Sequence, residues 1–479
     1  MALPCGSIGL AHTRKALALP AFYCSKNGLV FYCPSSLSLT FVRQLQAQAD
    51  VFLKRWAGLP RPASTAILFS GRSERAGLKI TQLVTFWKQM QAVRMDILKH
   101  SKDARCQLLY DQLLEQQSTW TRKYAPAVEH ACASTVVDAN PPDMNSDPLN
   151  QRRSSRTQPN RRKRILNILA DIDSEAQLSK LSQLSVQSRW LEWTDVMCCD
   201  LTWRRLLHGL DGGELCFTLQ AITNTTPTPD NLRRWGQQHI DPACKLCGSP
   251  STLRHVLNGC YTSLRQGRYT WRHNNVLRVL KRHLLEFWEF LKRQPPLSTE
   301  PFIHFRREGA RSTHATTAQR MRNRRPLLFG EALRCAPDWQ FLFDVDDGYS
   351  VFPPTIAATT QRPDAVLFSS SLRMVILLEL TVPLEDRVAT SHAIKNCRYA
   401  SLLATCETNG WHTAYFPFEV GSRGFVAHSL LSCLHQLGLP SWRSKKVRRE
   451  CSRVALRSSY VLYLRRSIPQ WSTSDTMQL

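Results

Sequence analysis

The chain is long and strongly basic, and it has the apolar content of a folded protein. It contains 479 residues, of which 43% are hydrophobic, and 63 lysines and arginines against 37 acidic residues give a formal net charge of +26. This length corresponds to about two to four domains. Such an excess of positive charge is typical of proteins that bind polyanions, above all nucleic acids. The alternative is a solvated basic surface on an unrelated protein.

Cysteine usage and hydropathy argue against secreted and membrane-spanning classes. The first residues, MALPCGSIGLAHTRKALALP, have no basic region before the first apolar residues, so we expect no secretory signal. No stretch reaches the about 18 uninterrupted apolar residues that a membrane span needs. We therefore expect the 16 cysteines to be reduced, and clustered cysteines become candidate metal ligands.

The first third of the chain is predicted to be helical between two irregular segments. Residues 1–40 are rich in Ser, Pro and Cys and lack periodicity, so we expect a poorly ordered N-terminus. Residues 41–137 are predicted to be helical, because apolar residues in LKITQLVTFWKQMQAVRMDIL recur at spacings of three and four. Residues 138–164 hold four prolines and almost no apolar side chains, which predicts a basic disordered linker.

Two basic clusters in this linker are candidates for nuclear targeting. Arg152 with Arg153 and the run from Arg161 to Arg164 resemble a bipartite nuclear-localisation signal. Solvated linkers also carry such runs, so the two readings stay open. The targeting reading predicts a nuclear protein.

The remaining segments predict an α+β multidomain protein. Residues 165–243 form a helical, Trp-rich linker domain, and residues 244–293 combine a cysteine–histidine cluster with a basic helix. Residues 294–324 are a basic loop. In residues 325–479 helix and strand patterns alternate, which favours an α/β domain.

The stretch CKLCGSPSTLRHVLNGC has the spacing of a metal site. Cys244, Cys247, His255 and Cys260 follow the pattern C-x₂-C-x₇-H-x₄-C. Three thiolates and one imidazole suit Zn²⁺, and four protein ligands leave no open position, so the predicted site is structural. The alternative is four unrelated residues in a Cys-rich chain.

The stretch RPDAVLFSSSLRMVILLELTVP places two acids in strand-like apolar runs. Alternation puts Val375, Leu377 and Glu379 on one face of a strand. A hairpin through the polar turn SSSLR would bring Asp364 close to Glu379. Two neighbouring carboxylates repel each other unless a hard divalent cation lies between them. Such an ion polarises a phosphate and lowers the pKa of an attacking water, so the pair is a candidate nuclease site.

The nuclease motif Pro-Asp…(Asp/Glu)-x-Lys also needs an ammonium, and its usual position is occupied by Thr381. In the following helix, His392, Lys395 and Tyr399 share one face. Lys395 is therefore predicted to supply the missing ammonium. The alternative is that Asp364 only ends a strand and that Glu379 pairs structurally with a lysine or arginine.

Basic and aromatic residues interleave in RQGRYTWRH, directly after the cysteine–histidine cluster. This pattern suits base stacking combined with phosphate contacts. The predicted nucleic-acid contacts are Arg265, Arg268, Tyr269, Trp271, Arg272 and His273.

Three blocks resemble, in order, the C-terminal part of non-long-terminal-repeat retrotransposon proteins that carry a restriction-like endonuclease. The first is TPTPDNLRRWGQQHIDPACKLCGSPSTLRHVLNGC with GRYTWRHNNVLRVL, which is similar to the CCHC zinc knuckle of that family and its trailing basic segment. The second is RPDAVLF with LLELTVPLEDR and the helix of Lys395. The third is NGWHTAYFPFEVGSRGFVAHSLL, with its EVG-x-RGF pattern.

The resemblance implies a C-terminal α/β restriction-endonuclease-like domain. In that family the equivalents of Asp364, Glu379 and Lys395 are the catalytic set, and the two acids bind Mg²⁺ or Mn²⁺. The accessory residues that it implies are Arg362, Tyr399 and the helix acid Glu331. The implied partners are DNA and element RNA.

Upstream, KRWAGLPRPASTAILF and the helix after it resemble the thumb of these proteins, but the polymerase core is missing. The nearest match to its Tyr-x-Asp-Asp turn is FDVDDGY, where Asp344 replaces the aromatic residue, so we expect a surface turn. A second Pro-Asp pair, at Asp338, is expected to be a decoy because no partner acid follows. The resemblance thus implies a DNA-nicking endonuclease, or alternatively a catalytically inactive nucleic-acid-binding remnant of a retroelement protein.

Overall fold

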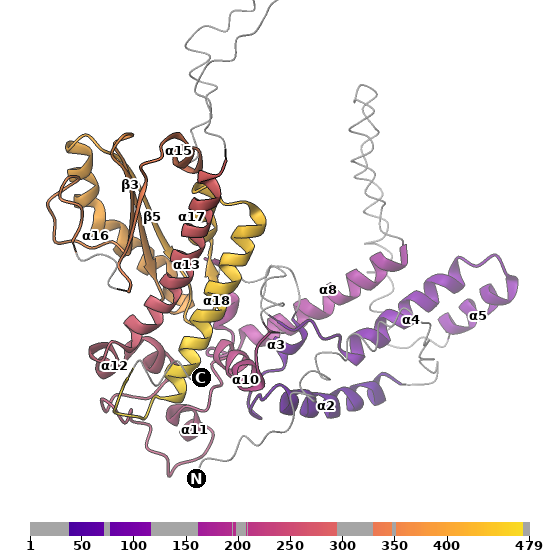
Figure 1. Cartoon of the computed structure of the whole chain (residues 1–479). Coiled ribbons are helices and arrows are strands. Elements are labelled where there is room, and N and C mark those ends of the chain that lie inside the picture. The colour runs from indigo at the N-terminus through magenta and orange to yellow at the C-terminus, as the bar shows by residue number, and fades with distance from the viewer. Residues whose placement is uncertain are drawn as a thin grey trace, which may run out of the picture. The chain divides into compact units, whose positions relative to one another are not determined.

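The computed structural model describes residues 38–70, 77–115, 161–193, 195–197, 207, 209–294, 329–346 and 351–472 (Figure 1). The chain divides into two compact units, Met1–Ser188 and Arg189–Leu479. Almost all of the N-terminal segment 1–40, the linker up to residue 160 and nearly all of the basic loop 294–324 lie outside the described residues. None of the described helices is long and apolar enough to cross a membrane.

The first unit, where it is described, is helical and has one small apolar core. Its helices are α2 (Leu39–Trp56), α3 (Ala66–Phe69), α4 (Leu83–Lys99), α5 (Ala104–Glu115) and α8 (Arg161–Ser182). Trp87 and Val93 of α4 pack with Val42 of α2 and Ile165 of α8. The amphipathic helix predicted around α4 is therefore present and packs in a helical bundle, as expected.

Helix α8 shows that the predicted linker boundary at residue 164 is wrong. The helix begins at Arg161, whose Nε donates a 2.7 Å hydrogen bond to Asp96 Oδ1. Further along α8, Asp173 accepts hydrogen bonds from Thr85 and Lys88. These contacts with α4 extend the helix into the basic run, which composition alone assigns to the linker. The expected domain 165–243 is also divided, because the first unit ends at Ser188 and the second begins at Arg189.

The second unit contains a mixed four-stranded sheet, so the chain is α+β. The strands lie in the order β2 (Gln340–Phe343), β3 (Ala365–Ser369), β4 (Met374–Thr381) and β5 (His412–Glu419). Strand β3 runs antiparallel to both β2 and β4, and β5 runs parallel to β4. A short second sheet pairs β1 (Val196–Met197) with β6 (Val426–Ala427).

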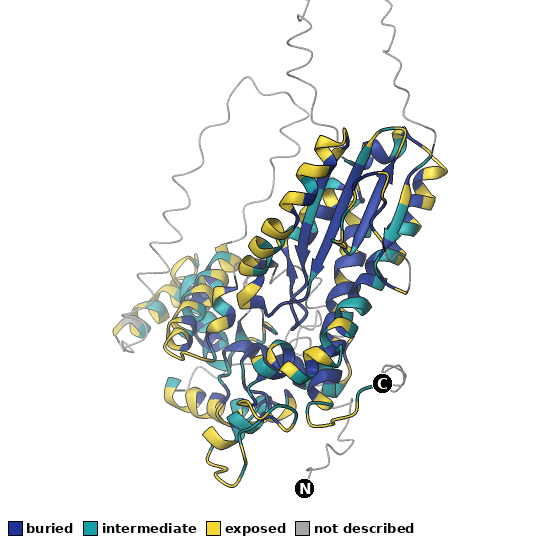
Figure 2. Cartoon of the chain, turned by 90° about the vertical axis from the view of Figure 1, so that its left-hand side faces the viewer, coloured by how far each residue is buried: buried dark blue, intermediate teal, exposed yellow. Residues whose placement is uncertain are grey.

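Helices cover both faces of the four-stranded sheet (Figures 1 and 2). One face carries α13 (Arg268–Lys292), α15 (Phe329–Cys335), α17 (His428–Gln436) and α18 (Ser441–Leu464). The other face carries α16 (Val388–Thr408), which connects β4 to β5. The remaining short helices are η1 (Arg189–Glu192), α10 (Gly212–Ile222), α11 (Pro229–Arg234), η2 (His255–Gly259), α12 (Tyr261–Arg265) and η3 (Glu385–Arg387).

Strand β4 divides its side chains between the two cores, as its sequence predicts. Ile376 and Leu378 pack under α13 and α18, while Val375 and Leu377 pack under α16. Because Glu379 continues the second set, its carboxylate lies on the α16 face.

Helix α13 belongs to the same core as the sheet. Leu277 and Leu284 of α13 are buried in one cluster with Ile376 and Leu378 of β4. In Figure 1 α13 runs beside α18 in front of the strands. The predicted boundary between the cysteine–histidine segment and the last domain therefore does not separate two cores.

The EVG-x-RGF stretch forms a buried connection at the end of the sheet. Glu385 accepts hydrogen bonds from the backbone N–H of Arg423, at 2.7 Å, and from its guanidinium, at 3.1 Å. A Cβ on Gly421 would lie 2.3 Å from Glu385 Oε1, so only glycine fits there. The Arg423 guanidinium also lies 4.8 Å from the Trp193 ring. This pattern is thus explained by packing around a buried ion pair.

Candidate functional site

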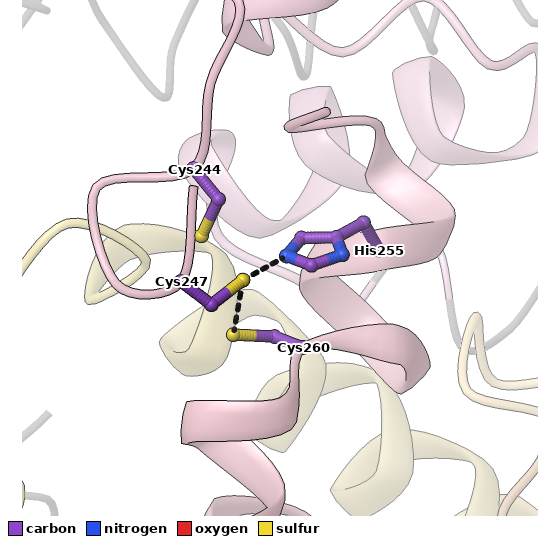
Figure 3. A group of neighbouring side chains, drawn as sticks. All are labelled: Cys244, Cys247, His255 and Cys260. Atoms are coloured by element: carbon purple, nitrogen blue, oxygen red, sulfur yellow. Dashed lines mark hydrogen bonds between the residues drawn. The ribbon is translucent and has the colours of Figure 1, made fainter. Parts of the chain in front are cut away.

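Four side chains form a compact Cys₃His cluster (Figure 3). The ligand atoms of Cys244, Cys247, His255 and Cys260 all lie within 4.8 Å of one another. Cys247 Sγ is 3.2 Å from His255 Nε2 and 3.7 Å from Cys260 Sγ. This is the donor set of a structural zinc site, and the cluster is compatible with Zn²⁺.

The chain reaches this geometry through a tight turn and a short helix. Gly248 adopts a φ of 75° and its N–H bonds the carbonyl of Cys244, so the two thiols of the CxxC turn face the same point. Helix η2 begins at His255, and Cys260 follows its end. Burial opposes ionisation of Cys247, but hydrogen bonds from Ser249 outweigh it and hold its pKa below the ordinary value.

Two arginines of the predicted nucleic-acid segment are buried, and their assignment to a nucleic-acid surface is wrong. Arg268 and Arg272 are each 1% exposed. Arg268 donates to the carbonyls of Arg465 and Ile468. Burial lowers the pKa of Arg272 to about 10, and its guanidinium donates to the Val382 carbonyl at 3.2 Å. Both stabilise the fold by satisfying backbone acceptors, so they are not available to phosphates.

The other members of this segment take different positions. The Tyr269 hydroxyl accepts a 2.9 Å hydrogen bond from Cys260 N–H, and burial raises the pKa of Tyr269 to about 12. The Trp271 ring contacts that of Trp471 at a centroid distance of 5.4 Å. Arg265 is exposed and Trp271 is half-buried, so their contacts with nucleic acid stay predictions.

Asp364 and Glu379 lie next to each other, as predicted from the hairpin. The register of β3 and β4 pairs Ala365 with Leu378, so the next pair outward is Asp364 with Glu379. Glu379 Oε2 accepts the Asp364 N–H at 3.1 Å, and Asp364 Oδ2 accepts the Leu380 N–H at 2.7 Å. Each carboxylate is therefore fixed by the backbone of the opposite strand.

Lys395 reaches this pair from helix α16. Its Nζ donates to Glu379 Oε1, and its side chain is 20% exposed while that of Glu379 is 2% exposed. Burial and the nearby Asp364 charge raise the pKa of Glu379, while Lys395 opposes the shift. The structure therefore brings together the three residues singled out as the catalytic set.

The accessory residues are only partly gathered around them. The Tyr399 hydroxyl donates to the Arg362 carbonyl at 3.1 Å, and burial together with the Glu379 charge raises the pKa of Tyr399. The Arg362 guanidinium pairs with Asp344 at the end of β2. Glu331 lies in α15, and its side chain is outside the described residues.

His273 contacts the acidic pair, a position that sequence reasoning missed. Its Nε2 lies 3.1 Å from Asp364 Oδ2 and 3.3 Å from the Leu380 carbonyl. Burial acts to lower the pKa of His273, but the charge of Asp364 and the hydrogen bonds with Asp364 and Asn274, together with the Glu379 charge, outweigh it and raise the pKa to about 9. No local pattern reveals this contact, because it depends on how α13 packs against the hairpin.

A second buried carboxylate lies beside the site. Glu419 of β5 is 1% exposed and is paired in register with Thr381 of β4. It accepts a 2.6 Å hydrogen bond from Ser429 Oγ, and His392 Nδ1 lies 3.1 Å from its other oxygen. An acid inside the apolar run YFPFEVG is the same signal that identified Glu379, so the sequence did contain it.

Asp338, the second Pro-Asp acid, has a structural role. It accepts hydrogen bonds from the hydroxyls of Ser369 and Ser371, both at 2.6 Å, and so holds the β3–β4 turn. These bonds lower the pKa of Asp338 to about 2. Its position agrees with the expectation that it is a decoy.

No protein-family model matches this chain, and none of the curated proteins does.

Proposed function

We propose that the second unit is a retrotransposon-derived, divalent-metal-dependent endonuclease that nicks DNA. The observation that carries the proposal is the placement of Asp364 opposite Glu379, with the Lys395 ammonium on the buried Glu379 carboxylate. The charge of +26 supports a polyanionic partner, DNA or element RNA. The basic runs that suggest nuclear targeting support a nuclear site of action.

The donor atoms fit the metal that this reaction uses. Asp364 and Glu379 would hold Mg²⁺ or Mn²⁺ through carboxylate oxygens, and the bound ion would polarise the phosphate and lower the pKa of an attacking water. Lys395 stabilises negative charge that develops on the phosphate in the transition state. The Tyr415 hydroxyl donates to the Lys395 carbonyl at 3.0 Å, which fixes the helical turn that presents the ammonium.

A plasmid-nicking assay with Mg²⁺ tests this proposal. Asp364→Asn and Lys395→Ala should each lower the nicking rate by about 10²–10³-fold, as for other groups that stabilise transition-state charge. Lys445→Ala, which removes an exposed lysine of α18, is the matched control and should nick like the wild type. Wild-type nicking by Asp364→Asn and Lys395→Ala would rule out the assigned site.

A catalytically inactive nucleic-acid-binding remnant is the second candidate. One observation favours it: Lys395 already neutralises Glu379 and His273 already contacts Asp364, as in a purely structural network. This alternative expects no metal-dependent nicking by the wild type, together with DNA binding that Asp364→Asn leaves unchanged. Filter binding on the same preparations separates the two candidates.

A further inference from the structure

We propose that the Cys₃His cluster positions the acidic site. Helix α13 is anchored to the cluster by Tyr269 and holds the Asp364 carboxylate through His273. Metal at the cluster therefore strengthens divalent-cation binding by Asp364 and Glu379. The inference rests on the proposed function, which supplies the divalent cation at the acidic site. It gives the cysteine–histidine segment the role of positioning the acids that bind this cation.

The anchor at the cluster end is the Tyr269 hydroxyl. It accepts the N–H of Cys260 at 2.9 Å and lies 3.2 Å from the His255 carbonyl and 3.1 Å from the Val256 carbonyl. Two of these residues are ligands of the cluster. One hydroxyl thus ties the start of α13 to the backbone on both sides of η2.

His273 lies four residues after Tyr269, so both side chains share one face of α13. Its Nε2 faces two acceptors, Asp364 Oδ2 at 3.1 Å and the Leu380 carbonyl at 3.3 Å, so this nitrogen carries a proton and donates. The same carboxylate oxygen accepts the Leu380 N–H. The carboxylate is therefore held from the helix as well as from the neighbouring strand.

A second connection joins the cluster to the end of β4. Asn258, inside η2, donates from Nδ2 to the Val382 carbonyl at 3.0 Å. Arg272 donates to the same carbonyl at 3.2 Å. Val382 lies three residues after Glu379, so the cluster is tied to Asp364 through His273 and to the end of the strand that carries Glu379 through Val382.

Metal makes this arrangement rigid. The four ligands come from the turn at residues 244–247 and from both ends of η2, and a tetrahedral ion fixes their mutual positions. Loss of the ion frees these segments, because folding of such clusters is coupled to metal binding. Residues that orient a metal ligand from outside affect metal affinity by about 10–100-fold.

Titration of the zinc-loaded full chain with Mn²⁺, with free Mn²⁺ measured by electron paramagnetic resonance, tests the inference without a nicking assay. The wild type should bind a Mn²⁺ ion that Asp364→Asn does not bind. His273→Ala should weaken this binding by about 10–100-fold. His273→Gln keeps an N–H donor near Nε2 and should restore the affinity to within about threefold. Tyr269→Phe, which leaves every ligand in place, should weaken it by about 2–10-fold.

His283→Ala is the matched control. His283 lies on the same helix, is buried and also contacts a carboxylate, at 2.9 Å from Glu450. Mn²⁺ affinity equal in His273→Ala and His283→Ala, or weak binding by His273→Gln as well as His273→Ala, would overturn the positioning role. Identical Mn²⁺ binding by the wild type and Asp364→Asn would instead overturn the proposed cation site, and the inference with it.

Discussion

Three of the almost completely buried glutamates of the second unit have different partners. Glu379 and Glu385 are 2% exposed, and Glu419 is 1% exposed. Their partners are, respectively, Lys395, Arg423, and the pair of Ser429 and His392. The Lys395 side chain is 20% exposed and that of Arg423 is 5% exposed. Water therefore reaches Lys395 more than it reaches Arg423, so of these two ion pairs the one at Glu379 opens to a cation at lower cost.

Glu419 allows a pH-dependent prediction. Burial is the largest cause of the raised pKa of Glu419, and the charge of Asp195 adds to it, while Ser429 and His392 oppose it. A raised folded-state pKa means stability that is present below the unfolded pKa and lost as pH rises through the folded pKa. Glu419→Gln should therefore be more stable than the wild type near pH 7 and equal to it near pH 4, measured by urea unfolding.

Glu450→Gln gives the opposite sign and serves as the control. Burial acts to raise the pKa of Glu450, but the hydrogen bond and charge of His283, together with the charges of Arg282 and Lys446, outweigh it and lower the pKa. Removing this carboxylate should cost stability near pH 7, and the loss should disappear as pH falls through the folded pKa. A pH-independent difference between Glu419→Gln and the wild type would contradict the burial argument.

At the scale of elements, local sequence patterns predicted those parts of the site that depend on contacts between residues close in sequence. The β3–β4 hairpin, the face of Glu379 and the position of Lys395 on the next helix follow from alternation, a short turn and helical periodicity. The contact between His273 and Asp364 does not, because these residues are 91 positions apart and meet only through packing. The burial of Arg268 and Arg272 was missed for the same reason: their acceptor carbonyls belong to distant segments.

Helix α13 depends on the backbone of Gly267. This residue adopts a φ of 70°, in the left-handed region, and a Cβ there would meet nothing within 4 Å. Gly267→Ala should therefore cost about 1–2 kcal/mol through backbone strain alone. Gly212→Ala at the start of α10 is the control, because its Cβ also meets nothing and its backbone is not left-handed. It should be neutral or stabilising by up to about 1 kcal/mol in urea unfolding. Equal effects of the two substitutions would rule out strain at Gly267.

At the scale of the whole molecule, the cysteine–histidine cluster and the sheet belong to one unit, Arg189–Leu479. Composition predicted domain boundaries at residues 293 and 324, but the residues on the two sides share one core, so the structure has no boundary there. Composition changes sharply at the basic loop, but Leu277 and Leu284 before it and Leu378 after it are buried together. The cluster is therefore expected to stabilise the entire second unit.

Metal removal should then destabilise the second unit as a whole. We expect about one zinc ion per chain, lost in Cys244→Ser. At free zinc of about 100 times the dissociation constant, this loss corresponds to about 2.7 kcal/mol of unfolding free energy. Cys397→Ser, an exposed thiol outside the cluster, should keep both zinc and stability. Zinc analysis with denaturant unfolding checks this, and an unchanged midpoint in the metal-free protein would contradict it.

The register that sets Asp364 opposite Glu379 also constrains how this sequence can change in length. The two acids lie at the open end of the β3–β4 hairpin. Deletion of one residue from β3 would therefore shift Asp364 out of register with Glu379, unless one residue were also deleted from β4. Insertions between residues 370 and 373 leave both arms intact. Related sequences that retain both acids should therefore show paired gaps in the two arms, or gaps confined to the turn.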